Sequence, residues 1–346
     1  MPSYLSRRSL LGAAAVLGVL ATGLTAPAAP VQAQEEKSFI LATATTGGTY
    51  YPVGVALATL TKVKLQPKQK ISLSAITSAG SGENIKLLRE NQAQFAILQG
   101  LYGGWAWTGT GAMEAEGKQE WLRSVTMLWQ NVEHFGVRSD YATSGTVSDL
   151  AAMSGKGFSI GRKNSGTEGS GRQILGNLGI DPDGTFELAY LGYTPSVEAV
   201  QNGNIDGFNI PAGAPVGAIT QGFAAMGEDL TILNFTDEQM AQANGDLELW
   251  TRYVIPAGTY PSQNADINTI AQPNVLGVHA DADEESVYLI TKTIYENLAF
   301  LNNIHPATKA MAIEKAIAGL PAPLHPGAAK FYLEQGIEIP ERLIAN

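Results

Sequence analysis

The alternation of short apolar strands with helices is the feature of this sequence that most constrains its fold. Apolar runs at Phe39–Thr43, Ile71–Ala75 and Phe95–Leu98 predict strands, and a helix is predicted from Pro52 between the first two. The same alternation recurs between residues 157 and 210. Alternation of this kind implies parallel strands with helices on both faces, so we expect a doubly wound α/β fold.

The length of the chain, 346 residues, corresponds to two domains rather than one. The C-terminal part changes character, because Val287–Leu301 has the spacing of an amphipathic helix. Two more helices are expected to start near Pro306 and Pro326. His305 and His325 directly precede these prolines and are expected to act as capping or turn residues.

The first 33 residues have the pattern of an export signal. Arg7 and Arg8 precede an apolar run from Leu10 to Leu24, and small residues follow up to Ala33. This run is shorter than the ~20 residues that span a bilayer, so we predict a signal peptide cleaved after about Ala33. The paired arginines fit the twin-arginine route, and ordinary secretion stays open. The mature protein is therefore expected outside the cytoplasm.

Composition excludes several classes of function. The net charge of −10 argues against a nucleic-acid or anionic-membrane binder, because both need basic surface. The sequence has no cysteine, which rules out disulfides, thiol catalysis and cysteine metal sites. The four histidines lack the i, i+4 spacing of a helical zinc pair, and no G-K-[ST] phosphate motif is present. Ser165 departs from the G-x-S-x-G hydrolase motif. We expect no cofactor, no metal and no enzymatic activity.

Three loops share one pattern: each follows a predicted strand, is rich in Gly, Ser, Thr or Asn, and leads into a predicted helix. They lie at residues 47–50, 78–84 and 164–168. In open α/β sheets, ligands bind at such helix N-termini, where free N–H groups and the helix dipole favour anions. One loop of this kind can be an ordinary helix start. Three of them, in both halves of the chain, predict a polar or anionic ligand held in a cleft.

Aromatic residues follow two of the predicted strands. Tyr102–Trp107 is a string of aromatics and glycines expected in a loop, and Trp129 ends a strand predicted from Val125. The sequence is compatible with two roles for these residues, packing onto the core and lining a pocket. Arg162 and Lys163 precede the third loop, where they can neutralise an anionic ligand or remain solvated.

Several motifs follow one another along the chain: Thr46–Gly54, Ser81–Gln99, Asn164–Glu168 with Gly207–Ile219, Ile255–Tyr260, Glu296–Leu298, His305–Ala307 and Leu324–Ala328. In this order they resemble the solute-binding proteins of the TAXI branch of TRAP transporters, over residues 39 to 337. The string His325-Pro326-Gly327 in particular makes the resemblance specific.

The resemblance implies a type II periplasmic binding protein with two lobes joined by two crossing strands. The implied division is a signal peptide over 1–33, lobe I over 34–137, lobe II over 138–274 and a return to lobe I over 275–346. A periplasmic monomer of this kind closes on a small organic anion such as glutamate, 2-oxoglutarate or a dicarboxylate. It then delivers the anion to TRAP permease subunits that use an ion gradient.

The resemblance also implies a set of ligand-binding residues. From the loops, strand ends and turns these are Gly48, Thr49, Tyr50, Ser81, Asn84, Gln99, Ser165, Gly166, Thr167, Glu168 and Gly213. Trp107 and Trp129 are added because both border the expected cleft, where the family usually has Tyr and a Tyr-Pro pair. His134 is interpreted as packing at the hinge rather than as a ligand contact. Two alternatives stay open, a receptor for an ABC importer and a secreted enzyme on the same fold.

Overall fold

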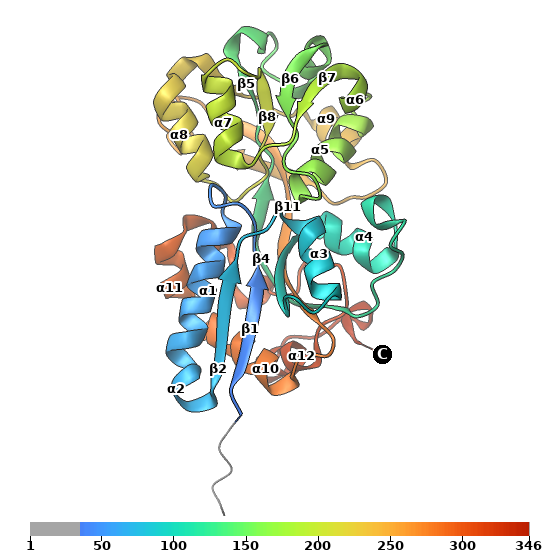
Figure 1. The fold of residues 1–346 in the computed structure, drawn as a ribbon, viewed down its shortest axis with the longest axis vertical. Coiled ribbons are helices and arrows are strands. Elements are labelled where there is room, and N and C mark those ends of the chain that lie inside the picture. The colour runs from blue at the N-terminus through green and yellow to red at the C-terminus, as the bar shows by residue number, and fades with distance from the viewer. Residues whose placement is uncertain (1–34, 346) are drawn as a thin grey trace, which may run out of the picture. The chain divides into compact units, whose positions relative to one another are not determined.

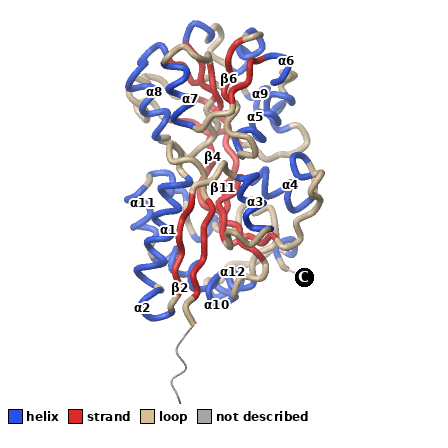
Figure 2. Tube along the Cα trace, in the orientation of Figure 1, coloured by secondary structure: helices blue, strands red, loops and turns tan. Residues whose placement is uncertain are grey.

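The computed structural model describes residues 35–345 and contains two β-sheets with helices on both sides of each (Figure 1 and Figure 2). The predicted signal peptide lies outside the described residues. The strands are β1 (Lys37–Ala42), β2 (Ile71–Ile76), β3 (Phe95–Gln99), β4 (Leu122–Val132), β5 (Phe135–Arg138), β6 (Lys156–Ser159), β7 (Phe186–Ala189), β8 (Gly207–Asn209), β9 (Leu230–Ile232), β10 (Thr251–Ile255) and β11 (Ile267–His279).

The first sheet has six strands in the order β10-β11-β3-β1-β2, with β4 paired to β11. The second has five, in the order β7-β6-β8-β5-β9. β1 runs parallel to β2 and β3, and β6 runs parallel to β7 and β8. β4, β5, β9, β10 and β11 pair antiparallel. We call the parts built on the first and second sheets lobe I and lobe II.

The helices cover both sides of each sheet. In lobe I they are α1 (Tyr50–Lys64), α2 (Gln66–Gln69), α3 (Ser81–Arg89), α4 (Gly100–Thr108), α10 (Glu284–Glu296), α11 (Leu298–Ile304) and α12 (Pro326–Glu334). In lobe II they are α5 (Gly166–Asn177), α6 (Pro182–Thr185), α7 (Tyr193–Gln201), α8 (Gly217–Met226) and α9 (Asp237–Asn244). Within the described part of the chain, no helix combines the length and the apolar character needed to cross a membrane.

The predicted α/β class is confirmed, but several expected elements differ. Tyr102–Trp107 lies in helix α4 and not in a loop. Gly103 is needed for close packing, because a Cβ there would lie 2.5 Å from Cγ of Pro321. The amphipathic segment Val287–Leu301 is divided between α10 and α11 at Asn297, and the segment from Pro306 is a short 3₁₀ helix. The capping roles are confirmed, since Nδ1 of His305 and of His325 accepts a hydrogen bond from the backbone of the second residue after it.

The chain first passes between the lobes at Glu133 and His134, between β4 and β5. It returns between β9 and β10. β11 pairs with β4 from Ala271–Val132 to His279–Leu122, so two long strands run together from lobe I to the junction (Figure 1). At the junction the N–H of Glu133 donates to the carbonyl of Ile270 at 2.9 Å.

His134 is fully buried beside this passage and is held on both ring nitrogens. Nδ1 lies 2.9 Å from the carbonyl oxygen of Val132 and 3.0 Å from that of Ile210, and Nε2 lies 2.8 Å from the hydroxyl of Tyr260. A neutral ring satisfies all three contacts when Nδ1 donates and Nε2 accepts. Burial lowers the pKa of His134 to about 4, which agrees with that form. The interpretation of His134 as packing at the hinge fits this geometry.

Replacing Tyr260 with Phe tests the junction. The Tyr260 hydroxyl donates to His134 and accepts from the N–H of Val216 at 3.2 Å, so its loss leaves two buried groups unpaired. We expect Tyr260→Phe to lower the free energy of unfolding by about 1–3 kcal/mol, measured by urea denaturation. The half-buried Tyr253, whose hydroxyl has no hydrogen-bond partner among residues 35–345, supplies the control. Equal stability of Tyr260→Phe and Tyr253→Phe would contradict the assigned role.

Candidate functional site

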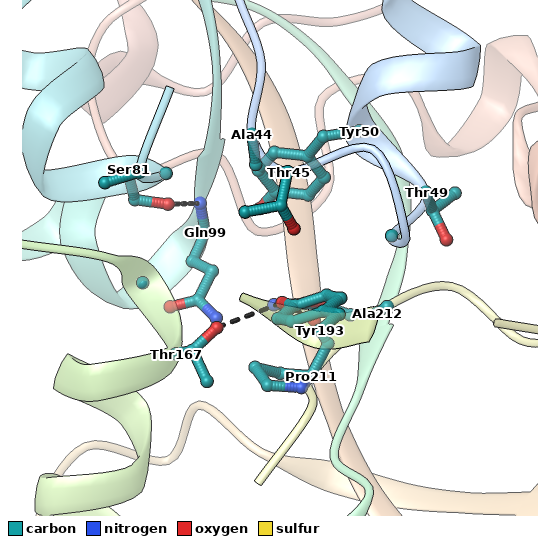
Figure 3. Close-up of a pocket in the computed structure, with 15 residues that line it drawn as sticks. Ala44, Thr45, Thr49, Tyr50, Ser81, Gln99, Thr167, Tyr193, Pro211 and Ala212 are labelled. Atoms are coloured by element: carbon teal, nitrogen blue, oxygen red, sulfur yellow. Dashed lines mark hydrogen bonds between the residues drawn. The ribbon is translucent and has the colours of Figure 1, made fainter. Parts of the chain in front are cut away.

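A pocket lies between the two lobes, where the N-termini of four helices meet (Figure 3). Lobe I contributes the starts of α1 and α3 through Gly48, Thr49, Tyr50, Gly80 and Ser81. Lobe II contributes the starts of α5 and α7 through Gly166, Thr167 and Tyr193. The first-turn N–H groups of a helix have no acceptor within their own helix and carry the positive end of its dipole. This arrangement is therefore suited to an anion.

The lobes touch each other around the pocket. The hydroxyl of Thr49 donates to the carbonyl of Gly213 at 2.8 Å, and the N–H of Ala218 donates to the carbonyl of Gly47 at 3.2 Å. On another side, the N–H of Glu83 donates to the carbonyl of Asn164 at 3.0 Å. The free space left inside is small, ≈ 20 Å³. The two lobes are therefore closed on each other in this structure.

Glycine is required at two of these helix starts. Gly80 precedes α3 with φ 127°, a conformation that side chains disfavour. A Cβ on Gly166 would lie 2.7 Å from Cδ of Gln99 and 2.8 Å from Oγ of Ser81, both in the other lobe. The glycines of the predicted loops therefore allow the lobes to approach closely.

The structure brings seven of the predicted residues together at the pocket: Gly48, Thr49, Tyr50, Ser81, Gln99, Gly166 and Thr167. In Figure 3 the side chain of Gln99 extends from the end of β3 towards Thr167. Ser81 accepts a hydrogen bond from the backbone of Gln99 at 3.1 Å, and Thr167 is 3.0 Å from the hydroxyl of Tyr193. Their role in ligand binding stays a prediction.

Four predicted residues lie beside the pocket. Asn84, Ser165 and Gly213 use polar groups in hydrogen bonds within the protein, whereas Nε1 of Trp129 has no partner in the described part of the chain. The amide of Asn84 donates to the carbonyls of Thr43 and Ile97 at 2.7 and 2.9 Å and so holds the loop before α3. The hydroxyl of Ser165 caps α5 by accepting from the N–H of Glu168 at 3.0 Å. Trp129 is buried behind Tyr50 and against Gly213, whose carbonyl accepts from Thr49. These residues support the wall of the pocket.

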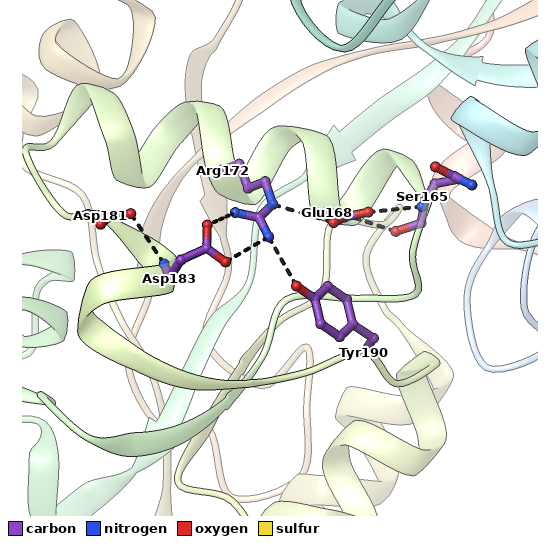
Figure 4. A network of polar contacts seen from close by, with 7 residues as sticks. Ser165, Glu168, Arg172, Asp181, Asp183 and Tyr190 are labelled. Carbon is purple, nitrogen blue, oxygen red and sulfur yellow. Dashed lines mark hydrogen bonds and ion pairs between the residues drawn. The ribbon is translucent and has the colours of Figure 1, made fainter.

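Two predicted residues point elsewhere. The carboxylate of Glu168 accepts from the N–H of Asn164 at 2.9 Å and from Arg172 at 3.4 Å (Figure 4). Arg172 also pairs with Asp183 at 2.6 Å, so Glu168 belongs to an ion-pair network along the side of α5. Trp107 lies half-buried on α4 with the guanidinium of Arg123 6.0 Å from its ring centre.

Sequence reasoning missed several residues of the pocket, among them Thr45, Asn131, Tyr193, Pro211 and Ala212. Tyr193 was missed because it lies at the start of α7, which none of the three predicted loops includes. Asn131 was missed because the strand was predicted to end at Trp129 and continues to Val132. The sequence offers no signal that separates Asn131 from the adjacent amide Gln130, because the structure decides which of the two reaches the pocket.

The pocket is electrically neutral in its side chains. None of the described residues that line it is Asp, Glu, Lys, Arg or His. Three of them carry buried polar atoms without a hydrogen-bond partner in the described part of the chain: the hydroxyl of Thr45, Oε1 of Gln99 and both amide atoms of Asn131. Buried polar groups usually have a partner, so these atoms are available to a bound molecule or to water.

A buried carboxylate, that of Glu133, lies two residues beyond Asn131. It is fully enclosed, and burial raises its pKa to about 7 in spite of the nearby donors Asn209, Ser170, Trp250 and Gln272. These donors come from both lobes, and none makes a well-formed hydrogen bond with the carboxylate among the described residues. An ionised Glu133 also contributes to the raised pKa of Tyr50 and of Tyr193 in the pocket, where burial is the larger cause.

The raised pKa of Glu133 predicts a dependence of stability on pH. The folded protein keeps this proton up to about pH 7, whereas the unfolded chain releases it near the ordinary value of 4.5. Between these values the unfolded state binds fewer protons, so the contribution of Glu133 to stability falls as pH rises. Glu133→Gln removes this pH dependence. Between pH 4.5 and pH 8 the free energy of unfolding of the variant should therefore rise by up to about 3 kcal/mol relative to that of the unchanged protein. Urea denaturation at both pH values measures this gain, and a difference that is the same at both would contradict it.

No group of three or more His, Asp or Glu side chains within residues 35–345 is arranged to hold a metal ion.

The fold resembles solved structures at low sequence identity. MatC from Rhodopseudomonas palustris, with bound malate, aligns with a TM-score of 0.53 and 12% identity over 86% of this chain and 98% of that chain. The alkanesulfonate-binding protein SsuA from Xanthomonas axonopodis pv. citri, bound to MOPS, aligns with a TM-score of 0.47 and 12% identity over 90% and 97%. A binding protein component of an ABC phosphonate transporter from Pseudomonas aeruginosa aligns with a TM-score of 0.49 and 9% identity over 78% of each chain.

The predicted fold class, the two-lobed α/β fold of periplasmic binding proteins, is confirmed by this likeness together with the two sheets. Ligand binding is what the names of these three structures describe. The model of the NMT1-like family matches residues 41–336, which is most of the sequence, and the chain therefore belongs to the NMT1-like family.

Proposed function

We propose that this protein is an exported solute receptor that captures a small organic anion between its lobes and delivers it to a membrane transporter. The observation that carries the proposal is the meeting of four helix N-termini, two from each lobe, at one pocket. An anion placed there receives N–H donors from both lobes at once. Its binding therefore favours the state in which the lobes are closed.

The closed state also explains how binding can be signalled to a transporter. Direct contacts such as Thr49 to Gly213 and Glu83 to Asn164 form only when the two lobes approach. A ligand that bridges the lobes adds its own contacts to these, and the closed surface differs from the open one. The protein binds and releases its ligand without making or breaking covalent bonds.

For the transporter we propose a TRAP-type permease driven by an ion gradient. The proposal rests on the ordered motifs that resemble the TAXI branch, from Thr46–Gly54 to Leu324–Ala328. Two observations test it: whether a multi-helix permease gene or an ATPase gene lies beside this one, and whether uptake by cells that carry the system stops when the ion gradient is collapsed. An adjacent ATPase gene, with uptake that persists without the gradient, would assign the protein to an ABC importer.

A thermal-shift screen tests the receptor function directly. The chain lacking residues 1–33 is unfolded and refolded to remove bound ligand, and is then screened against amino acids, 2-oxo acids, 2-hydroxy acids, dicarboxylates and sugars. A ligand at 100 times its dissociation constant should add about 2.7 kcal/mol of stability. Stabilisation by organic anions and not by sugars is expected. Stabilisation by sugars alone would overturn the proposal.

Gly166→Ala should weaken binding of the stabilising anion at least tenfold. The new Cβ meets Gln99 and Ser81 at 2.7 to 2.8 Å, which prevents the lobes from closing fully. Gly176→Ala on the same helix is the matched control, because a Cβ there has no heavy atom within 4 Å. The control should keep its affinity and gain up to about 1 kcal/mol in stability. Isothermal titration gives the two affinities, and unchanged binding by Gly166→Ala would show that closure at this glycine is not required.

A further inference from the structure

The chemistry of the pocket limits which organic anion it can accept. The helix N-termini offer N–H donors for one carboxylate, and the described lining residues include no basic side chain for a second negative charge. The same residues include no acidic side chain for a positive charge. A second charged group of either sign, beyond the carboxylate held by the helix N-termini, would find no side chain of opposite charge there to replace its hydration, which is costly. The rest of the ligand should therefore be uncharged.

Asn131 supplies the partner for an uncharged polar group. Its side chain is 1% exposed, and both its Nδ2 donor and its Oδ1 acceptor are without partners in the described part of the chain. An amide with both atoms available is matched by a hydroxyl group, which donates and accepts at the same time. An ammonium group only donates hydrogen bonds. It would therefore leave the Nδ2 donor of Asn131 unpaired and facing a positive charge.

The carboxylate of Glu133 lies behind the pocket, close enough to contribute to the raised pKa of Tyr50 and of Tyr193, and its surroundings do not suit an ammonium. Asn131 and Glu133 are two residues apart along the chain, and Glu133 does not line the pocket. Its carboxylate is enclosed by Asn209, Ser170, Trp250 and Gln272, which offer it neutral donors. A second carboxylate on the ligand would moreover be repelled by Glu133 when that residue is ionised.

We propose that the natural ligand is a small 2-hydroxy monocarboxylate, held by its carboxylate at the helix N-termini and by its hydroxyl at Asn131. This inference rests on the proposed function and narrows it. It implies that the site discriminates against α-amino acids, whose ammonium takes the place of the hydroxyl, and against dicarboxylates.

Three compounds with the same carbon skeleton test the inference: lactate, alanine and propionate, the first two as both enantiomers. They differ only in carrying a hydroxyl, an ammonium or a hydrogen at C2. One enantiomer of lactate should bind the refolded protein at least tenfold more tightly than alanine and than propionate, as measured by isothermal titration. Succinate, tested beside them, should bind more weakly than lactate.

Asn131→Asp supplies a second test, because it replaces the donor with a negative charge at the same position. This variant should lose at least tenfold in affinity for lactate, and its ratio of alanine to lactate affinity should rise. Gln130→Glu adds the same charge at the neighbouring residue of β4, which does not line the pocket, and should keep the preference of the unchanged protein.

The outcomes separate the inference from the function on which it rests. Equal or tighter binding of alanine, propionate or succinate would overturn the inference and leave the receptor function standing. Failure of every organic anion to bind, in this test and in the thermal-shift screen, would overturn both. A preference for lactate that Asn131→Asp leaves unchanged would remove Asn131 from the site and overturn the inference as stated.

Discussion

The antiparallel pairing of β4 with β11 is the interaction on which the rest of this structure depends. These strands are paired within the first sheet and run on to the junction, where the chain enters the second lobe. Their register places Gln272 opposite Asn131, so polar side chains from both strands gather at the junction. Glu133 and His134 follow directly, and both are fully buried. One pair of strands thus joins the lobes, forms part of the pocket and carries the most perturbed carboxylate described here.

The pocket attracts an anion with backbone groups instead of basic side chains. Helix starts at Tyr50, Ser81, Gly166 and Tyr193 lie together at the pocket, and no rotamer of a long side chain has to be fixed for this. The arrangement lowers stability, because Asn131, Gln99 and Glu133 hold buried polar atoms that lack partners among the residues described. Buried polar atoms without hydrogen-bond partners are typical of binding sites, where the ligand supplies the missing partners.

Much of the fold and part of the candidate site could be predicted because the relevant signals are local. A strand, a loop of small polar residues and a helix follow one another within about ten residues at Thr49, Ser81 and Gly166, and all three loops do reach the pocket. Glu168 shows where local reasoning stops. The resemblance implied a ligand contact for Glu168, but its carboxylate turns back to the N–H of Asn164 and to Arg172.

The sequence by itself determined the α/β class, the capping roles of His305 and His325 and the small, polar character of the loops, because each depends on residues near one another in the chain. Only the tertiary structure decided that Asn131 and Tyr193 enter the pocket, that Trp107 lies away from it and that Glu133 is enclosed by donors from both lobes. These outcomes depend on strand register and on contacts between residues far apart in the chain. A shift of one residue in the pairing of β4 with β11 would turn Asn131 to the other face of the sheet.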